Sequence, residues 1–258
     1  MDRIAAAVFD LDGVVTFTAR VHAAAWKQLF DEYLGSIPGS TPFRPFTPED
    51  YRLYVDGRLR YNGVERFLRS RGISLPDGTP SDSPSANTIC GLGNRKDLIF
   101  RSQVERMGVE VDDGAIRLIR DLRKEGVRIG VASSSKNATL VLERAGLRSL
   151  FQAQVDGVVS EQLKLRSKPH PDIFLYCLSL LAVSDPARAT VFEDAVAGVQ
   201  AGQAGDFGLV IGVDRGDNKA DLLKHGADFV LHEFTDMSVN RLFELYALAW
   251  SAKQKRAG

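Results

Sequence analysis

The chain has 258 residues, and its 33 lysine and arginine residues balance 33 aspartate and glutamate residues. A formal charge of zero argues against attraction to nucleic acid or to an anionic membrane as the basis of function. The content of 44% hydrophobic and 26% charged residues is typical of a folded globular protein. No stretch approaches the roughly 18 consecutive apolar residues of a membrane span, and Asp10 interrupts the apolar N-terminal segment too early for a secretion signal. We therefore expect a cytoplasmic protein with no nucleic-acid partner and no membrane partner.

Short apolar and β-branched segments alternate with segments of helical periodicity along most of the chain. Residues 5–9 (AAAVF) have the character of a buried strand, and Gly126 ends a helix directly before the next strand. Further strands are predicted at residues 127–132, 153–155, 190–193, 208–213 and 228–231. Helices are predicted at residues 115–125, 137–145, 171–182, 195–204 and 219–225. This alternation indicates an α/β fold with a doubly wound parallel sheet.

The segment after the first strand has a different character. Helical periodicity is found at residues 19–34, 63–71 and 96–107, and Thr47-Pro48-Glu49-Asp50 is typical of a capped helix start. A loop rich in proline, serine and aspartate is predicted at residues 76–87. We therefore predict two domains, with the bounds 1–17 and 109–258 for the α/β core and 18–108 for a helical insert.

Four segments of polar residues are expected at the carboxyl ends of the strands of the core. Ligands of such sheets bind beyond the carboxyl ends of the strands, so these segments should converge at one edge. The segments are Asp10-Leu11-Asp12-Gly13, Ser133-Ser134-Ser135-Lys136-Asn137, Lys168-Pro169 and Glu193-Asp194.

Carboxylates dominate this predicted site. Asp10 and Asp12 point the same way in an extended chain. Repulsion between two such groups raises one pKa, which suits a nucleophile beside a general acid. Oxygen ligands from Asp10, Glu193 and Asp194 suit Mg²⁺. Each pattern also has an ordinary explanation, because acidic residues are common in turns and helix caps.

The other two segments suit a phosphate group. Residues 133–137 offer hydroxyl and N–H groups at the start of a predicted helix, a favourable place for an anion; helix capping by Ser135 or Asn137 would explain them as well. Lys168 precedes a proline and therefore lies in extended chain, although alone it could be a solvated lysine. Together, Mg²⁺ and Lys168 would offset the charge of a phosphate beside three carboxylates, and this favours phosphate chemistry.

Four motifs in this order resemble the signature motifs of the haloacid dehalogenase superfamily. They are DLDG with Thr18 and His22 downstream, ASSSKN, KPHPDIF and FEDAVAGVQAG. Within the superfamily, the chain is most similar to β-phosphoglucomutases and their sugar-phosphatase relatives. The resemblance implies that Asp10 forms a phosphoaspartate, that Asp12 is the general acid and base, and that Ser133 and Lys168 bind the transferring phosphate.

The resemblance also implies one cofactor, Mg²⁺. The ion would be held by Asp10, the backbone carbonyl of Asp12 and Asp194, with Glu193 near the metal. Substrate binding would extend to Ser135, Lys136 and Asn137. Relatives of this size are often monomers, and a monomer is expected here.

The helical insert resembles the cap of this family. Gly57 and Arg60 match a cap loop whose arginine binds the phosphate that is not transferred, a role suited to bidentate pairing. Lys96 lies in a second basic element (Asn94-Arg95-Lys96), and it or Lys136 would assist Arg60. His22 matches a hinge histidine that links cap closure to Asp12. Ordinary alternatives are a solvated arginine at 60 and a packed helix histidine at 22.

Two departures from the family pattern stand out. The family often has an aspartate between two threonines after the glycine, and this chain has Phe17 between Thr16 and Thr18. The cap also carries an additional loop around residues 74–93.

Three functions are therefore considered. The first is interconversion of β-glucose 1-phosphate and glucose 6-phosphate through a phosphoaspartate. The second is a sugar-phosphate phosphatase in which water attacks the same intermediate. The third, a non-catalytic phosphate-sensing domain resembling a receiver, would leave Asp12 and the long insert unexplained.

Overall fold

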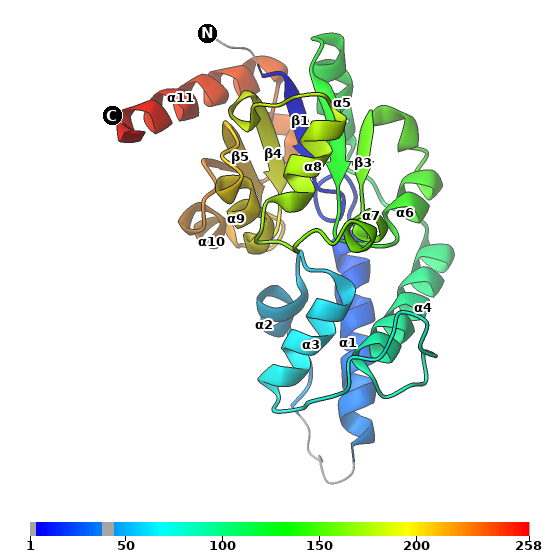
Figure 1. Cartoon of the computed structure of the whole chain (residues 1–258). Helices are drawn as coiled ribbons and strands as arrows, with labels where there is room; N and C mark the ends of the chain where they lie inside the picture. The colour runs from blue at the N-terminus through cyan, green and yellow to red at the C-terminus, as the bar shows by residue number, and fades with distance from the viewer. Residues whose placement is uncertain (1–3, 38–43, 258) are drawn as a thin grey trace. The chain divides into compact units, whose positions relative to one another are not determined.

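The computed structural model describes residues 4–37 and 44–257, and its contacts divide the chain into two compact units (Figure 1). One unit comprises Met1–Phe17 with Glu110–Gly258, and the other comprises Thr18–Val109. The predicted bounds placed residue 109 in the core, whereas the contacts assign it to the second unit. Residues 38–43 of the predicted insert lie outside the described residues.

The first unit contains a six-stranded, wholly parallel sheet in the order β3-β2-β1-β4-β5-β6 (Figure 1). The strands are β1 (Ala6–Phe9), β2 (Arg128–Ala132), β3 (Ala153–Val155), β4 (Ala189–Glu193), β5 (Leu209–Val213) and β6 (Phe229–Leu231). The helices are α5 (Asp113–Lys124), α6 (Ala138–Arg144), α7 (Gly157–Gln162), α8 (Asp172–Leu180), α9 (Val196–Ala204), α10 (Lys219–Lys224) and α11 (Val239–Ala257). The order reverses beside β1, which confirms the doubly wound fold.

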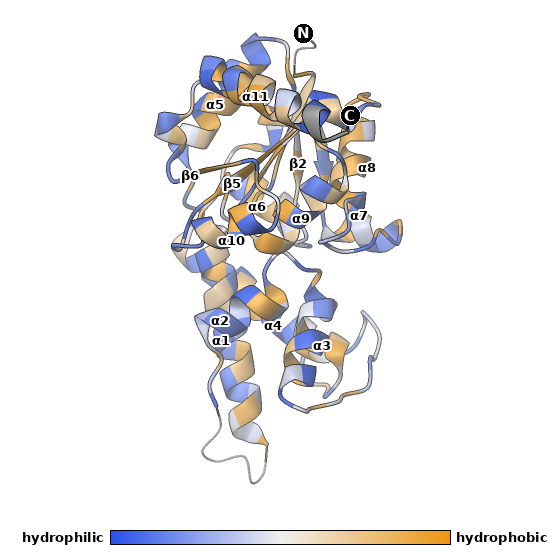
Figure 2. Ribbon diagram, turned by 90° about the vertical axis from the view of Figure 1, so that its left-hand side faces the viewer, coloured by the Kyte–Doolittle hydropathy of each residue, from blue (hydrophilic) through white to orange (hydrophobic). Residues whose placement is uncertain are grey.

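Both faces of this sheet are buried, which explains why its strands read as continuous apolar runs (Figure 2). Ala6 and Val8 point to one face, where they pack with Phe174 of α8. On β1 and β4, the rings of Phe9 and Phe192 stack at 4.4 Å, and Phe192 also contacts Phe234. Side chains alternate along each strand, so apolar residues at successive positions supply both layers.

The second unit is helical and is inserted directly after β1. Its helices are α1 (Thr18–Ser36), α2 (Pro48–Asp50), the π-turn η1 (Tyr51–Val55), α3 (Arg60–Ser70) and α4 (Ile89–Met107). Aromatic rings pack among the aliphatic side chains of its core: the ring of Phe30 lies 5.1 Å from that of Phe46 and 4.1 Å from that of Phe67.

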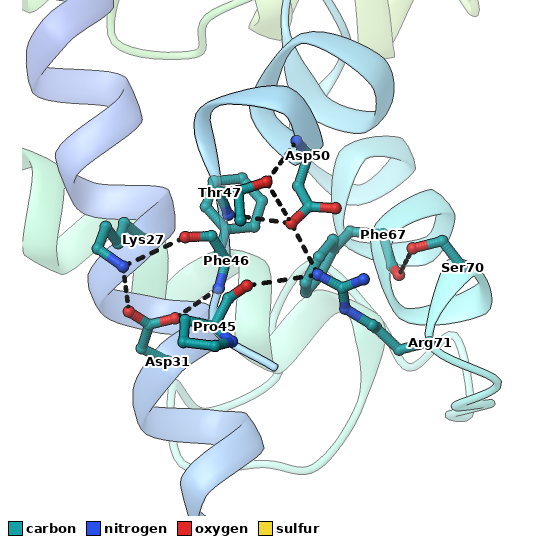
Figure 3. Close-up of polar contacts among 9 residues, drawn as sticks. All are labelled: Lys27, Asp31, Pro45, Phe46, Thr47, Asp50, Phe67, Ser70 and Arg71. Carbon is teal, nitrogen blue, oxygen red and sulfur yellow. Dashed lines mark hydrogen bonds and ion pairs between the residues drawn. The ribbon is translucent and has the colours of Figure 1, made fainter. Parts of the chain in front are cut away.

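A polar network joins three segments of this unit (Figure 3). Thr47 caps α2, as predicted, by accepting the N–H of Asp50, and the Asp50 carboxylate accepts the N–H of Thr47 in return. Arg71, after α3, pairs with the same carboxylate at 2.7 Å. On α1, Asp31 accepts the N–H of Phe46 at 2.8 Å. These bonds fix the segment before α2 against both α1 and α3.

Four helices differ from the sequence-based prediction, and one of them, α3, begins at Arg60 rather than at residue 63. Helix α4 begins at Ile89 rather than at residue 96 because Thr88 caps it by accepting the N–H of Gly91. Helices α7 and α11 were not predicted. Among residues 4–37 and 44–257, no helix combines the length and hydrophobicity that a membrane crossing requires.

Candidate active site

The carboxyl ends of three neighbouring strands deliver the polar residues of the first unit. Asp10 follows β1, Ser133 follows β2, and Glu193 ends β4. The strand ladder continues past β1, because the N–H of Asp10 donates to Phe192 at 2.9 Å. The parallel pairing therefore brings together residues that are more than a hundred positions apart in the chain.

Lys168 lies between two buried carboxylates. Its Nζ atom is 2.6 Å from Oδ1 of Asp10 and 2.7 Å from Oε2 of Glu193, and all three side chains are buried. The ring of Phe174 lies 4.8 Å from the ammonium group. Such short charge-assisted contacts fix the nucleophile candidate in a single orientation.

Burial and mutual charge shift the acid–base properties of this triad. Burial opposes the ammonium charge, but Asp10 and Glu193 outweigh it and raise the pKa of Lys168. Burial raises the pKa of Glu193, and the charge of Asp10 raises it further against the opposing effect of Lys168. Burial likewise raises the pKa of Asp10, with Lys168 opposing and Asp12 adding to the shift. The excess of negative charge over positive charge is thus costly.

The acidic residues fit a hard divalent cation. Asp10, Glu193 and Asp194 each offer one carboxylate oxygen, and these atoms lie within 4.8 Å of one another. Three carboxylates and the ammonium group of Lys168 leave a formal charge of −2, which one divalent cation would neutralise. Oxygen donors of this kind are the ligands that Mg²⁺ prefers. These three predicted carboxylates therefore lie close enough together to hold one cation, while the role of the Asp12 carbonyl stays a prediction.

Gly13 makes room for this cluster. Its φ is +99°, and a Cβ atom added there would lie 1.8 Å from Oδ2 of Asp194. Both the backbone conformation and the close approach of a carboxylate require glycine at this position.

Asp12 is oriented by Ser133 and by Asp10. The hydroxyl of Ser133 donates to Oδ2 of Asp12 at 2.8 Å, and the N–H of Asp12 donates to Oδ2 of Asp10 at 2.9 Å. Asp10 therefore holds the backbone of Asp12, and Ser133 holds its carboxylate.

The rest of the predicted phosphate segment is tied to Ser133 along the backbone. The N–H of Ser135 donates to the Ser133 hydroxyl at 3.0 Å, and the N–H of Asn137 donates to the Ser135 hydroxyl at 3.1 Å. Lys136 pairs instead with Glu161 of α7 at 2.7 Å. Its predicted help to a cap arginine stays a prediction.

In the second unit, Lys96 and His22 form an aromatic-lined pair. The ammonium group of Lys96 contacts Nδ1 of His22, and it lies 5.0 Å from the ring of Trp26 and 4.8 Å from that of Phe100. The imidazole stacks on Phe100 at 3.9 Å. Lys96 is buried despite its charge, while Thr18 is the buried first residue of α1.

Arg60 is the first residue of α3 and is held by a carboxylate. Its Nη2 atom lies 2.7 Å from Oδ1 of Asp97, whose second oxygen lies 3.1 Å from Nε of Arg101. Gly57, in the preceding turn, has a φ of +68°. The predicted cap arginine is thus nearly buried and already oriented.

One supporting residue was absent from the sequence-based prediction. The side-chain amide of Asn218 donates to the backbone carbonyl of Asp194 at 3.0 Å. Asp214 holds this loop by accepting the N–H groups of Gly216 and Asn218. The sequence does indicate these residues, because residues 214–218 follow the strand predicted at 208–213. Ligands of such sheets bind beyond the carboxyl ends of the strands.

An acidic site at the carboxyl edge of a doubly wound sheet, with a helical insert directly after the central strand, defines the haloacid dehalogenase class of enzymes. The model of the haloacid dehalogenase-like hydrolase family matches residues 4–206, so the chain belongs to this family. It is an enzyme, of the phosphotransferase or mutase type or of the phosphatase type.

Individual relatives are consistent with this assignment. The chain is 43% identical over 242 residues to β-phosphoglucomutase from Mycobacterium bovis, covering 92% of each chain. It is 32% identical over 241 residues to β-phosphoglucomutase from Bacillus subtilis, covering 93% of this chain and 94% of the relative. The crystal structure of β-phosphoglucomutase from Clostridium difficile is similar with a TM-score of 0.77 and 25% identity, covering 95% of this chain and 98% of the other.

Proposed function

We propose that the protein is a β-phosphoglucomutase that interconverts β-glucose 1-phosphate and glucose 6-phosphate. The observation that carries phosphoryl transfer is the contact of Lys168 with Asp10, beside a metal-compatible acidic cluster. The choice of sugar phosphate is supported by the relatives that bear this name and extend over nearly the whole chain.

In the proposed reaction, Asp12 takes a proton from a hydroxyl of the bound sugar monophosphate as that oxygen attacks the phosphoaspartate, and the bond from phosphorus to Asp10 breaks, which gives the sugar bisphosphate. In the second half, a carboxylate oxygen of Asp10 forms a bond to the phosphorus of the other phosphate group while the bond from that phosphorus to the sugar oxygen breaks, and Asp12 gives a proton to the departing oxygen. Asp10, Glu193 and Asp194 would hold Mg²⁺, with the Asp12 carbonyl as a further ligand, and the cation would offset the negative charge of the phosphate.

Ser133 and Lys168 have separate roles in this scheme. Lys168 keeps the Asp10 carboxylate oriented and compensates charge at phosphorus. Ser133 donates to Asp12 and so directs the proton-transfer group. A group that both gives and takes a proton must keep one position through both half-reactions.

Arg60 is proposed to distinguish the mutase from a hydrolase. A mutase passes through a sugar bisphosphate and must hold the second phosphate while the first is transferred. An arginine suits this role because its planar fork matches the phosphate oxygens. Asp97 keeps the guanidinium extended and nearly buried, so little side-chain entropy remains to be lost on binding.

The deciding experiment supplies β-glucose 1-phosphate, Mg²⁺ and a trace of the sugar bisphosphate, and then quantifies glucose 6-phosphate and free phosphate. A mutase accumulates glucose 6-phosphate. Accumulation of free phosphate alone would instead assign the sugar-phosphate phosphatase. The same incubation with other sugar phosphates tests the choice of sugar.

Arg60→Ala tests the role of the cap. We expect the variant to lose isomerisation while phosphate release from a simple aryl phosphate continues. Arg69→Ala is the matched control, since this arginine lies on the same helix, is exposed and pairs only locally with Glu65 among the described contacts. Unchanged isomerisation in Arg60→Ala would contradict the assignment.

A further inference from the structure

Arg215, in the loop after β5, binds the backbone that follows the two catalytic aspartates. Its Nε atom donates to the carbonyl of Gly13 at 2.8 Å, and its Nη2 atom donates to that of Val14 at 3.4 Å. The same Nη2 atom pairs with Asp112, which also caps α5 by accepting the N–H of Ala115. One guanidinium group therefore joins two distant segments to the loop after β1.

The bonds within that loop show why an external donor is needed. The N–H of Gly13 donates to Thr16 at 2.7 Å, and the carbonyl of Leu11 accepts the N–H groups of Val15 and Thr16. The carbonyls of Leu11 and Thr16 are thus used inside the turn, whereas those of Gly13 and Val14 accept from Arg215. Gly13 and Val14 are buried, and a buried carbonyl that lacks a partner is costly.

These contacts act on Asp12 from its C-terminal side. Asp12 is held on its N-terminal side by its own N–H bond to Asp10, and its carboxylate is held by Ser133. The peptide group that follows it joins the Asp12 carbonyl to the N–H of Gly13, and the carbonyl of Gly13, in the next peptide group, accepts from Nε of Arg215. Because only the φ and ψ rotations of Gly13 separate these two peptide groups, holding the second one limits how far the Asp12 carbonyl can turn.

Phe17 completes the environment of this arginine. Its ring lies 4.8 Å from the guanidinium carbon, and that of Phe234 lies 5.9 Å away. Phe17 stands where the family pattern often has an aspartate, and here an aromatic face replaces a possible charged partner. The guanidinium keeps its donors for the two carbonyls and for Asp112.

We propose that Arg215 is a positioning residue for phosphoryl transfer: by binding the carbonyls of Gly13 and Val14, it fixes the turn that orients Asp12. The inference rests on the proposed function and assigns Arg215 no contact with the substrate. It predicts a loss in the chemical step rather than in substrate affinity.

The test compares Arg215→Ala and Arg215→Lys with Arg128→Ala. Arg128 is a matched control, because it also donates to two successive backbone carbonyls of the first unit, those of Leu181 and Ala182. With an aryl phosphate and Mg²⁺, we expect kcat of Arg215→Ala to fall by about 10- to 100-fold, the range typical of residues that support a site indirectly. KM should stay near the wild-type value. Added guanidinium at low millimolar concentration should restore part of kcat in Arg215→Ala and leave Arg128→Ala unaffected.

Arg215→Lys keeps the positive charge but not the planar guanidinium group. It replaces Arg215→Ala in the comparison if the alanine variant does not fold. We expect a lower kcat with a melting temperature close to that of the wild type. Hydrogen exchange supplies a readout that does not depend on activity, because the amides of Gly13 and Thr16 should exchange faster in Arg215→Lys. Wild-type kcat in both Arg215 variants, or unchanged exchange at these amides, would overturn the inference. If these amides exchange faster in Arg215→Lys but the wild-type protein transfers no phosphate, the result instead contradicts the proposed function.

Discussion

The ammonium group of Lys168 lies 2.6 Å from Oδ1 of Asp10, although 158 positions separate the two residues in the chain. Glu193 contacts the same ammonium group and Asp194 belongs to the same cluster, so the ammonium group pairs with two of three neighbouring carboxylates. Much of the expected behaviour of the enzyme follows from this imbalance.

Lys168→Met should destabilise the protein as well as inactivate it. The substitution removes the ammonium group that pairs with two buried carboxylates, and loss of one partner of a buried ion pair costs about 3 kcal/mol or more. Urea unfolding should therefore show a free energy of unfolding lower by about that amount. Lys253→Met is the control, since Lys253 pairs with Asp228 at a partly exposed site and its loss should cost about 1 kcal/mol or less. Equal losses in the two variants would refute the argument.

Mg²⁺ should raise the melting temperature, because a cation that binds only the folded chain stabilises it by mass action. At a concentration about 100 times the dissociation constant, the gain is about 2.7 kcal/mol. The melting temperature is compared in magnesium chloride and in sodium chloride of equal ionic strength. Asp194→Asn should lose most of the difference, whereas Asp185→Asn, outside the acidic cluster, should keep it. A shift that survives Asp194→Asn would place the metal elsewhere.

Gly13→Ala should abolish activity and the stabilisation by Mg²⁺. A methyl group at this position would collide with the Asp194 carboxylate in addition to straining the backbone. Gly126→Ala separates the two effects, because Gly126 also has a positive φ, of +80°, but an added Cβ there meets nothing within 4 Å. The control should lose about 1 to 2 kcal/mol of stability and keep its kcat. Similar kcat values for both variants would show that the space beside Asp194 is unimportant.

Asp50 should make the second unit sensitive to acid (Figure 3). Burial opposes its ionisation, but hydrogen bonds from Thr47 and the pairing with Arg71 outweigh burial and lower its pKa below the ordinary value of 3.8. A lowered pKa means that Asp50 stabilises the fold above its ordinary pKa and that this contribution is lost as the pH falls through the folded-state pKa.

The free energy of unfolding of Asp50→Asn should therefore lie below that of the wild type near neutral pH, by about 1 to 3 kcal/mol. The gap should narrow as the pH falls from about 5 toward 2. Urea unfolding at several pH values measures it, and the difference between the two proteins removes the contribution of the other carboxylates. A constant gap would show that the ionised form of Asp50 is not what stabilises the unit.

Much of the first unit could be predicted because its signals are local. Apolar runs and glycine stops identified the five strands after β1 to within two residues, and the rule that ligands bind beyond the strand ends brought Asp10, Ser133 and Glu193 to one edge. Helix α7 was missed because it is short and contains the β-branched pair Val158-Val159, which favours a strand over a helix. Helix α11 was missed because it lies beyond the last predicted strand, outside the alternation of strands and helices.

The second unit was less predictable. The start of α4 depends on Thr88, which directly follows the segment 76–87 that is predicted as a loop. The side chain of Asp82 accepts from Thr79 and Thr88, so polar contacts rather than apolar periodicity order that loop. Such bonds leave no repeating pattern in the sequence.

By itself, the amino-acid sequence determined which chemical groups the protein offers and, through the order of strands and helices, the sheet that gathers them. Only the tertiary structure decided which partner each group contacts. Asp97 pairs with Arg60, Glu161 pairs with Lys136, and Arg215 donates to the carbonyl of Gly13 in the turn after Asp12. The physical reason is that hydrophobic periodicity depends on residues that are close together in the sequence. A hydrogen bond or ion pair depends instead on atoms that folding brings within about 3 Å of one another.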